Sequence, residues 1–267
     1  MDSIRENRTP EDVAREIKMM FDEDIDEELC VVLVEGSDDV KFMEDILEEN
    51  VECVESPCGG KHGLNELIEN PLIQKKEVLA IRDKDYMDIE VLPDRMFVYD
   101  GCCLETMILS NLDVAEKFYK FYQGNLEKAY YIINAMRQLA PYSVLRKKNE
   151  LECLGINFEK VGFGDLVAEN GMELIKLFER VKQSERFCLC KEEADNIKDV
   201  DLWDITNGHD LYTYLGILSK CGKKTLGKDG VKEVLLAIYR KTDFKTTKLY
   251  QSILLYQQKN RLKFVNA

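Results

Sequence analysis

The sequence predicts an α/β fold in which a parallel-sheet domain is followed by a mostly helical region. Up to about residue 110, short apolar runs alternate with segments of helical periodicity. Residues 29–34, LCVVLV, form a continuous apolar run of the kind that is buried on both faces of a parallel sheet. From residue 104 onward the strand pattern fades and helical spacing dominates. We therefore expect β-α-β units first and helices afterwards.

The first half is expected to begin with a helix and then to alternate between strands and helices. Thr9 suits the N-cap of the first helix, and Pro10 suits its first position. An acidic linker is expected to separate this helix from the first strand. The expected elements that follow are a strand at 29–36, a helix at 38–50, a strand at 51–57, a Gly-rich loop at 59–63, a helix at 64–73, and strands at 76–85 and 95–101.

The second half is expected to be helical, over residues 104–122, 126–140, 171–184, 209–220 and 230–241. These patterns divide the chain into three parts. Residues 1–28 are expected to form an N-terminal helix and acidic linker, residues 29–110 the α/β domain, and residues 111–267 a mainly helical region with a basic tail.

Composition indicates a globular protein of the cytoplasm. The 267 residues are 45% hydrophobic and 33% charged, and no apolar run approaches the roughly 20 residues that span a membrane. The polar N-terminus lacks the apolar core of a signal peptide. The nine cysteines show no repeated C-x-x-C and there are only two histidines, so we expect reduced thiols and no zinc site.

The net charge of −14 is unevenly spread. Residues 1–110 hold 30 acidic and 11 basic side chains, a net charge of −19, whereas residues 206–267 hold 4 acidic and 12 basic side chains, a net charge of +8. An acidic half attracts metal ions and a basic segment suits phosphates. A solvated helix face explains the same lysines equally well, so charge alone leaves the partner open.

Acidic side chains follow two of the expected strands. Glu35 ends the first, while Asp83 and Asp85 end the third, two residues apart, so that in an extended segment their side chains project from the same face. Carboxylates held together repel unless a cation lies between them, and hard oxygen ligands suit Mg²⁺ or Mn²⁺. The carboxyl ends of parallel strands share one edge. An acidic turn is the plainer interpretation of a D-x-D sequence on its own.

Several short motifs resemble a known family. LVEGSDDVKF, CGGKHG and IRDKDY are similar to the motifs of the Toprim domain, a Rossmann-like parallel-sheet domain shared by topoisomerases, bacterial primases and the nucleases of the OLD family. Further along, CCLETMILSN and LWDITNGHDL resemble motifs of a Toprim/OLD-like family. That family includes the Toprim nuclease subunit (AriB type) of the PARIS anti-phage system.

The resemblance implies roles for individual residues. Glu35 matches the Toprim glutamate, a metal ligand or general acid/base, and Asp83 and Asp85 match the pair that holds Mg²⁺. Asp39 matches the second acid of an E-G-x-x-D motif that supports a second metal, and Glu105 matches a glutamate that follows the fourth strand. The catalytic residues implied are thus Glu35, Asp83, Asp85 and Glu105, and all five acids are implied metal ligands.

Plainer roles remain open for several of these residues. Asp39 and Glu105 could lie on exposed helix faces, although Glu105 has apolar neighbours among which an unpaired carboxylate is costly. Ser37 and Asp38 are expected to cap the second helix.

Lys61 and His209 are the residues expected to contact substrate phosphate. Lys61 lies in the Gly-rich loop, and an ordinary turn explains that loop equally well. His209 or Asn207 could instead cap the helix that follows. CGKKTLGK lacks the order of a P-loop, so this chain is not expected to bind ATP.

Together the motifs predict an Mg²⁺- or Mn²⁺-dependent endonuclease with one or two ions, which hydrolyses RNA such as tRNA, or DNA. The resemblance further implies an effector of bacterial anti-phage defence, an ABC-type ATPase partner and a homodimer. A non-enzymatic Toprim-fold module that binds a partner is the first alternative. A primase-type nucleotidyl transferase is the second, and a topoisomerase is disfavoured because the chain is short.

Overall fold

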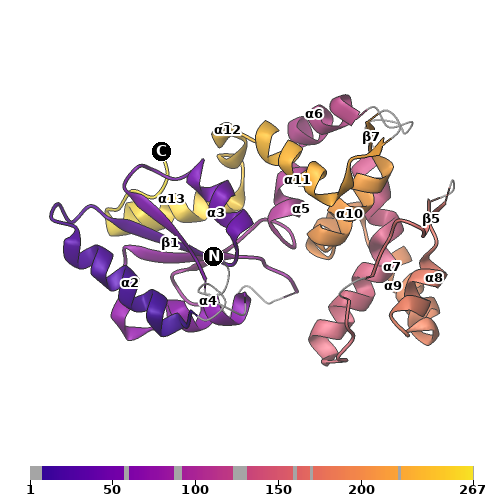
Figure 1. Ribbon diagram of the computed structural model, residues 1–267, viewed down its shortest axis with the longest axis horizontal. Coiled ribbons are helices and arrows are strands. Elements are labelled where there is room, and N and C mark those ends of the chain that lie inside the picture. Colours follow the sequence, from indigo (N-terminus) through magenta and orange to yellow (C-terminus); the bar gives the residue numbers. More distant parts are fainter. Residues whose placement is uncertain are drawn as a thin grey trace. The chain divides into compact units, whose positions relative to one another are not determined.

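The computed structural model describes residues 8–56, 60–86, 92–122, 131–158, 161–168, 171–221 and 224–266. The chain forms two compact units (Figure 1). The first comprises residues 1–84, 88–100 and 240–267, and the second comprises residues 85–87 and 101–239. Within the described ranges, no helix has both the length and the apolar character needed to cross a bilayer.

The first unit is built on a four-stranded parallel sheet, which confirms the expected α/β class. The strands are β1 (Cys30–Val34), β2 (Val51–Glu55), β3 (Val78–Arg82) and β4 (Met96–Val98), in the spatial order β2-β1-β3-β4. Every residue of β1 and β3 is buried, as their apolar sequences predict for the two central strands.

Helices cover both faces of this sheet (Figure 1). On one face lie α2 (Pro10–Glu23) and α4 (Lys61–Ile68), and on the other lie α3 (Ser37–Glu44) and α13 (Lys248–Asn260). The core beneath α2 and α4 is aliphatic, formed chiefly by Val13, Ala14, Ile17, Val31, Leu33, Leu64, Leu67, Val78 and Ala80. The start of α2 confirms the predicted cap, because Thr9 is the N-cap before Pro10 and forms a capping box with Asp12.

The opposite face is aromatic. Phe42 of α3 makes edge-to-face contacts with Tyr99, which follows β4, at 6.4 Å between ring centroids, and with Phe244 at 6.1 Å. Phe244, at the end of α12 (Lys241–Phe244), also contacts Tyr250 of α13 at 5.8 Å. The last two helices therefore pack in the first unit, although the sequence grouped them with the helical region at 111–267.

Asp100 anchors α13. Its two carboxylate oxygens accept the backbone N–H groups of Lys248 and Leu249 at 2.8 and 2.9 Å, at the end of the helix where N–H groups have no partner within the helix. Because Asp100 follows β4 by two residues, this contact fixes the helix next to the sheet.

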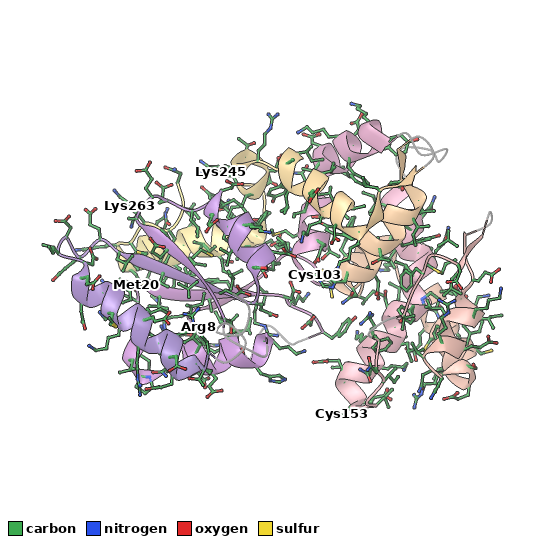
Figure 2. All side chains as sticks on the ribbon, viewed as in Figure 1. Arg8, Met20, Cys103, Cys153, Lys245 and Lys263 are labelled. Carbon is green, nitrogen blue, oxygen red and sulfur yellow. The ribbon has the colours of Figure 1, made fainter. Side chains whose placement is uncertain are left out.

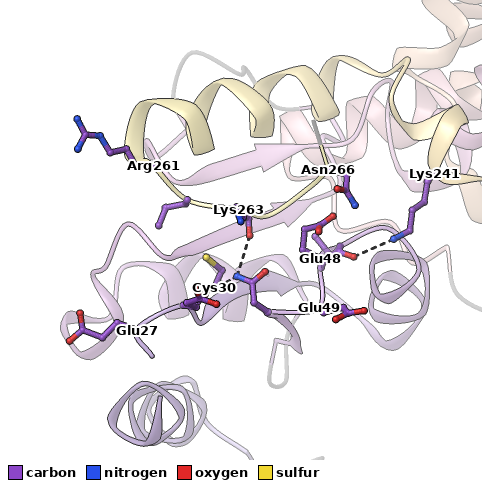
Figure 3. Close-up of a pocket in the computed structure, with 12 residues that line it drawn as sticks. Glu27, Cys30, Glu48, Glu49, Lys241, Arg261, Lys263 and Asn266 are labelled. Atoms are coloured by element: carbon purple, nitrogen blue, oxygen red, sulfur yellow. Dashed lines mark hydrogen bonds between the residues drawn. The ribbon is translucent and has the colours of Figure 1, made fainter. Parts of the chain in front are cut away.

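The C-terminal segment also closes a pocket of about 550 Å³ at the amino-terminal ends of β1 and β2 (Figure 3). Cys30 begins β1 in its wall, and the side chain of Asn50 donates to the backbone oxygen of Lys263 at 3.5 Å. Lys241 donates to the backbone oxygen of Leu47 at 3.4 Å. These polar contacts hold the end of the chain against the sheet.

The second unit is mainly helical, as predicted. Its helices are α5 (Leu104–Ser110), α6 (Leu112–Tyr122), α7 (Tyr131–Glu152), α8 (Leu174–Arg180), α9 (Phe187–Asp195), α10 (Gly208–Leu218) and α11 (Gly227–Ile238). Two short antiparallel ribbons, β5–β6 (Val167–Ala168 with Gly171–Met172) and β7–β8 (Lys220–Cys221 with Lys224–Thr225), were not predicted. Strands of two residues carry too little periodicity to be recognised from sequence.

The single helix expected at 104–122 is divided at Asn111. This residue leaves the helical conformation with ψ 112°, and its side-chain oxygen accepts the N–H groups of Asp113 and Val114 at 3.0 and 3.3 Å. Asn111 thereby ends α5 and caps α6, because a short amide side chain competes with backbone acceptors.

The described cysteines carry free thiols, as predicted, and differ in exposure (Figure 2). Cys103 is buried in the second unit, whereas Cys153 is exposed. Burial raises the pKa of Cys190 to about 11, so its thiol stays protonated at neutral pH.

Replacing Asp100 with alanine removes the acceptor of two backbone N–H groups. We expect the free energy of local opening at the start of α13 to fall by about 1–2 kcal/mol, the usual value of a helix cap. Hydrogen exchange of the peptide covering residues 245–256 measures this change. The Asp100→Asn variant keeps one side-chain oxygen and is expected to lose less, and unchanged exchange in Asp100→Ala would contradict the anchoring role.

Candidate functional site

The carboxyl edge of the parallel sheet collects polar side chains in the first unit. Glu35 follows β1, Asp83 follows β3 and Tyr99 follows β4, while Gly60 ends the loop after β2. In a parallel sheet these positions meet at one edge, which is where ligand sites of α/β proteins form. We take this edge as the candidate site.

The carboxylate of Glu35 is held by the end of β3, the strand next to its own. Its Oε1 lies 3.5 Å from Nε of Arg82 and accepts the backbone N–H of Asp83 at 3.3 Å. On the other side, a Cβ at Gly60 would lie 3.7 Å from Oε2. Gly60 has φ +51°, a conformation that other residues adopt only with strain, so the loop approaches the carboxylate through a residue without a side chain.

Arg82 is the buried cation beneath this carboxylate. Its side chain is 1% exposed, and it donates from Nη1 to the amide oxygen of Asn65 at 3.0 Å and from Nε to the backbone oxygen of Asp83 at 3.1 Å. A charge at this depth requires a charged partner, and Glu35 is that partner. Arg82 was not among the predicted site residues, although a basic residue at the end of the otherwise apolar strand VLAIR is a usable signal.

Asp39 has the capping role that was predicted for Ser37 and Asp38. Its Oδ2 accepts the N–H of Gly36 at 3.1 Å, and its Oδ1 accepts the hydroxyl of Tyr99 at 2.7 Å. Gly36 is the N-cap of α3 and Ser37 its first residue. The expectation that Ser37 and Asp38 cap this helix was therefore wrong, because the third helical residue reaches back to the free N–H of the cap.

Both Asp39 and Asp83 affect the pKa of Tyr99. Burial raises the pKa of Tyr99 well above its usual value, and the charge and hydrogen bond of Asp39 and then the charge of Asp83 raise it further. Tyr99 therefore stays protonated and donates to Asp39. Asp83 contributes to this shift because its charge lies close to the same hydroxyl.

The ligand chemistry of this edge fits Mg²⁺ or Mn²⁺. Three carboxylates and one guanidinium leave a formal charge of −2, and carboxylate oxygen is the ligand these ions prefer. Across the described ranges, no three His, Cys, Asp or Glu side chains gather closely enough to hold a metal ion by themselves. Mg²⁺ is commonly held by one or two carboxylates with water and phosphate, and Glu35 and Asp83 suit that arrangement.

Asp85 belongs to the second unit. Strand β3 ends at Arg82, and Asp85 has φ +49° and donates its N–H to the backbone oxygen of Cys102 at 2.8 Å. The expected extended D-x-D segment, with Asp83 and Asp85 on one strand face, was therefore wrong. A turn replaces it, held by the hydrogen bond to Cys102.

Glu105, also in the second unit, lies in the first turn of α5 with its side chain 16% exposed. A Cβ at Gly208 would overlap the Glu105 carboxylate, so this carboxylate lies directly against the start of α10. The N–H groups at a helix start carry partial positive charge and stabilise an anion there. The Oε1 atom of Glu105 lies 3.7 Å from Nε2 of His209.

The two residues expected to contact phosphate lie in separate units. Lys61 is half-buried and is the first residue of α4, so residues 61–63 are helical rather than part of the expected loop at 59–63, and residue 59 lies outside the described ranges. In the second unit, the side chain of Asn207 caps α10, while His209 is 67% exposed. His209 is therefore not needed for capping.

A scan against protein-family models finds no match to this chain, and a search of curated protein sequences finds none either. The assignment of a function therefore depends on the geometry above and on the sequence motifs.

Replacing Tyr99 with phenylalanine removes the hydroxyl that donates to Asp39. We expect the free energy of unfolding at pH 7, in EDTA, to fall by about 1–3 kcal/mol, the usual value of a hydrogen bond to a charged group. Because the folded-state pKa of Tyr99 is raised above 10.0, its contribution is complete below pH 10 and declines as the pH rises further.

Urea unfolding at pH 7, 9 and 10.5 checks both statements. The difference between the wild-type protein and Tyr99→Phe should be constant up to pH 9 and smaller at pH 10.5. A difference that does not depend on pH would contradict the raised pKa.

Proposed function

We propose that the protein is a metal-dependent nuclease that hydrolyses phosphodiester bonds in RNA, such as tRNA, or in DNA. The observation that carries this proposal is the set of carboxylates at the carboxyl edge of the parallel sheet, Glu35, Asp39 and Asp83. Buried Arg82 and Tyr99 hold two of them in place. Carboxylates held at this edge are typical of enzymes that use Mg²⁺ on phosphate groups.

Each residue has a proposed role. Glu35 and Asp83 hold the ion, and Asp39 supports a second one. Bound Mg²⁺ or Mn²⁺ would polarise the phosphoryl oxygen and lower the pKa of the attacking water. Arg82 orients Glu35, which lies 3.5 Å away, and Tyr99 orients Asp39 through a 2.7 Å hydrogen bond. Such supporting contacts commonly affect metal affinity as strongly as the ligands do.

The Toprim/OLD-like resemblance extends the proposal. Beside the phosphate contacts proposed for Lys61 and His209, the resemblance implies that Asp85 and Glu105 act as further metal ligands. It also implies an effector of anti-phage defence in the cytoplasm, restrained by an ABC-type ATPase, with a homodimer as its assembly. The segments at residues 102–111 and 202–211, which hold Glu105 and His209, carry the resemblance to the AriB-type proteins.

One observation favours a non-enzymatic binding module instead. Both oxygens of Asp39 already accept hydrogen bonds, one as a helix cap and one from Tyr99. A carboxylate used in this way stabilises the fold without a metal ion. Metal binding by the wild-type protein separates the two functions.

Replacing Glu35 with glutamine, or Asp83 with asparagine, is expected to reduce cleavage by about 100-fold or more, because each change removes a charged oxygen ligand. The assay incubates the protein with 5′-labelled tRNA, single-stranded DNA and duplex DNA, with Mg²⁺, Mn²⁺ or EDTA. Glu44→Gln, which removes an exposed acid of α3, is the control and should cleave like the wild-type protein.

If none of the substrates is cleaved, calorimetric titration with Mn²⁺ decides between the alternatives. Binding by the wild-type protein that is lost in Glu35→Gln and Asp83→Asn supports a metal centre whose activity is restrained. Absence of binding by the wild-type protein would contradict the proposed function.

A further inference from the structure

An open pocket of about 600 Å³ lies in the second unit, beside His209. Its wall includes Arg146, Gly155, Asn157, Phe158, Asn207 and His209, contributed by α7, the segment after it and the start of α10. The donors along this wall are a guanidinium, an imidazole and two amides. Their number suggests a ligand rich in hydrogen-bond acceptors.

Arg146 is held rigidly in this wall. Its Nε and Nη2 atoms donate to the two oxygens of Asp210, which is buried. The guanidinium also lies over the ring of Phe158, 4.4 Å from its centroid, and near Tyr142 at 5.5 Å. Because the Arg146 side chain is already fixed, it loses less conformational entropy when a ligand binds.

The same arrangement leaves part of the guanidinium available. Arginine has five N–H groups, and Asp210 accepts two of them. Within the ranges that the structure describes, Nη1 makes no hydrogen bond, and Arg146 lines the pocket. An acceptor in the pocket can therefore bind Arg146 without displacing Asp210.

His209 offers a second donor. Its Nδ1 lies 3.0 Å from Nζ of Lys228, and since lysine can only donate, Nδ1 accepts and the ring proton is on Nε2. The distance of 3.7 Å from Nε2 to Glu105 is too long for a hydrogen bond, so this N–H is available to a ligand. Lys228 adds positive charge next to it.

We propose that this pocket binds a phosphate group of the nucleic acid, with Arg146 and His209 as the donors. A cation is disfavoured beside Arg146 and Lys228, and an apolar ligand would leave the donors without partners. A phosphate accepts hydrogen bonds from several directions and matches the planar guanidinium. The inference rests on the proposed function for the identity of the substrate, but binding at this pocket requires no metal ion.

Gly155 offers a matched pair of variants that share the same backbone strain and differ in charge. A Cβ at this position would meet nothing within 4 Å, and its φ of +68° is one that asparagine and aspartate tolerate best among residues with side chains. Gly155→Asp adds a negative charge to the pocket wall. Gly155→Asn adds nearly the same shape without the charge and is the matched control.

Fluorescence anisotropy with 5′-fluorescein-labelled single-stranded RNA and DNA of 20 nucleotides, in EDTA, measures binding without cleavage. We expect Gly155→Asp to raise the Kd about 10-fold, because like charges repel across the pocket, and Gly155→Asn to stay within about 2-fold of the wild-type protein. Equal Kd values for the two variants, or no binding by the wild-type protein, would overturn the proposal.

The exposed side chain of His209 provides a second pair of variants, His209→Glu and His209→Gln. Both remove the imidazole donor and should weaken binding, and the charged variant should raise the Kd about 10-fold more than the neutral one. Inorganic phosphate should displace the RNA from the wild-type protein more strongly than chloride at equal ionic strength. If it does not, the pocket does not recognise phosphate. A charge effect in EDTA, in a protein that neither cleaves nor binds Mn²⁺, would support this pocket and reject the nuclease. Metal-dependent cleavage without a charge effect would support the nuclease and reject this pocket.

Discussion

The buried guanidinium of Arg82 is the constraint on which the arrangement of the first unit depends. It ends a strand whose other residues are apolar, and an uncompensated charge at this depth would cost several kcal/mol. Glu35, on the neighbouring strand β1, supplies the compensating carboxylate, and Asn65 of α4 accepts a further N–H. One side chain thus joins β1, β3 and α4 at the carboxyl edge and fixes the position of the Glu35 carboxylate.

The rest of that edge is supported from the end of the chain. Tyr99 donates to Asp39 while its ring packs against Phe42, which in turn contacts Phe244. Asp100, the next residue, anchors α13 through two backbone hydrogen bonds. The position of Asp39 therefore depends, through Tyr99 and Phe42, on a C-terminal segment that lies far from it in the sequence.

The second unit also contains an arginine–carboxylate pair, but the more exposed partner is the arginine instead of the carboxylate. Arg146 and Asp210 form a buried pair, as Arg82 and Glu35 do in the first unit. In the first unit the guanidinium is buried and the carboxylate is partly exposed, so the pair presents an anion. In the second unit Asp210 is buried and Arg146 lines a pocket, so the pair presents a cation. An anion suits a metal ion and a cation suits a phosphate.

The sequence by itself determined the parallel α/β class, the N-cap at Thr9, the mainly helical second half, and Glu35 and Asp83 at the ends of two strands. These features depend on burial patterns and capping preferences that act within a few residues. Only the tertiary structure decided that Arg82 holds Glu35, that Tyr99 holds Asp39 and that α13 packs in the first unit. The pairs Glu35–Asp83 and Asp39–Tyr99 are separated by 48 and 60 residues, so packing of the whole unit is what brings their atoms together.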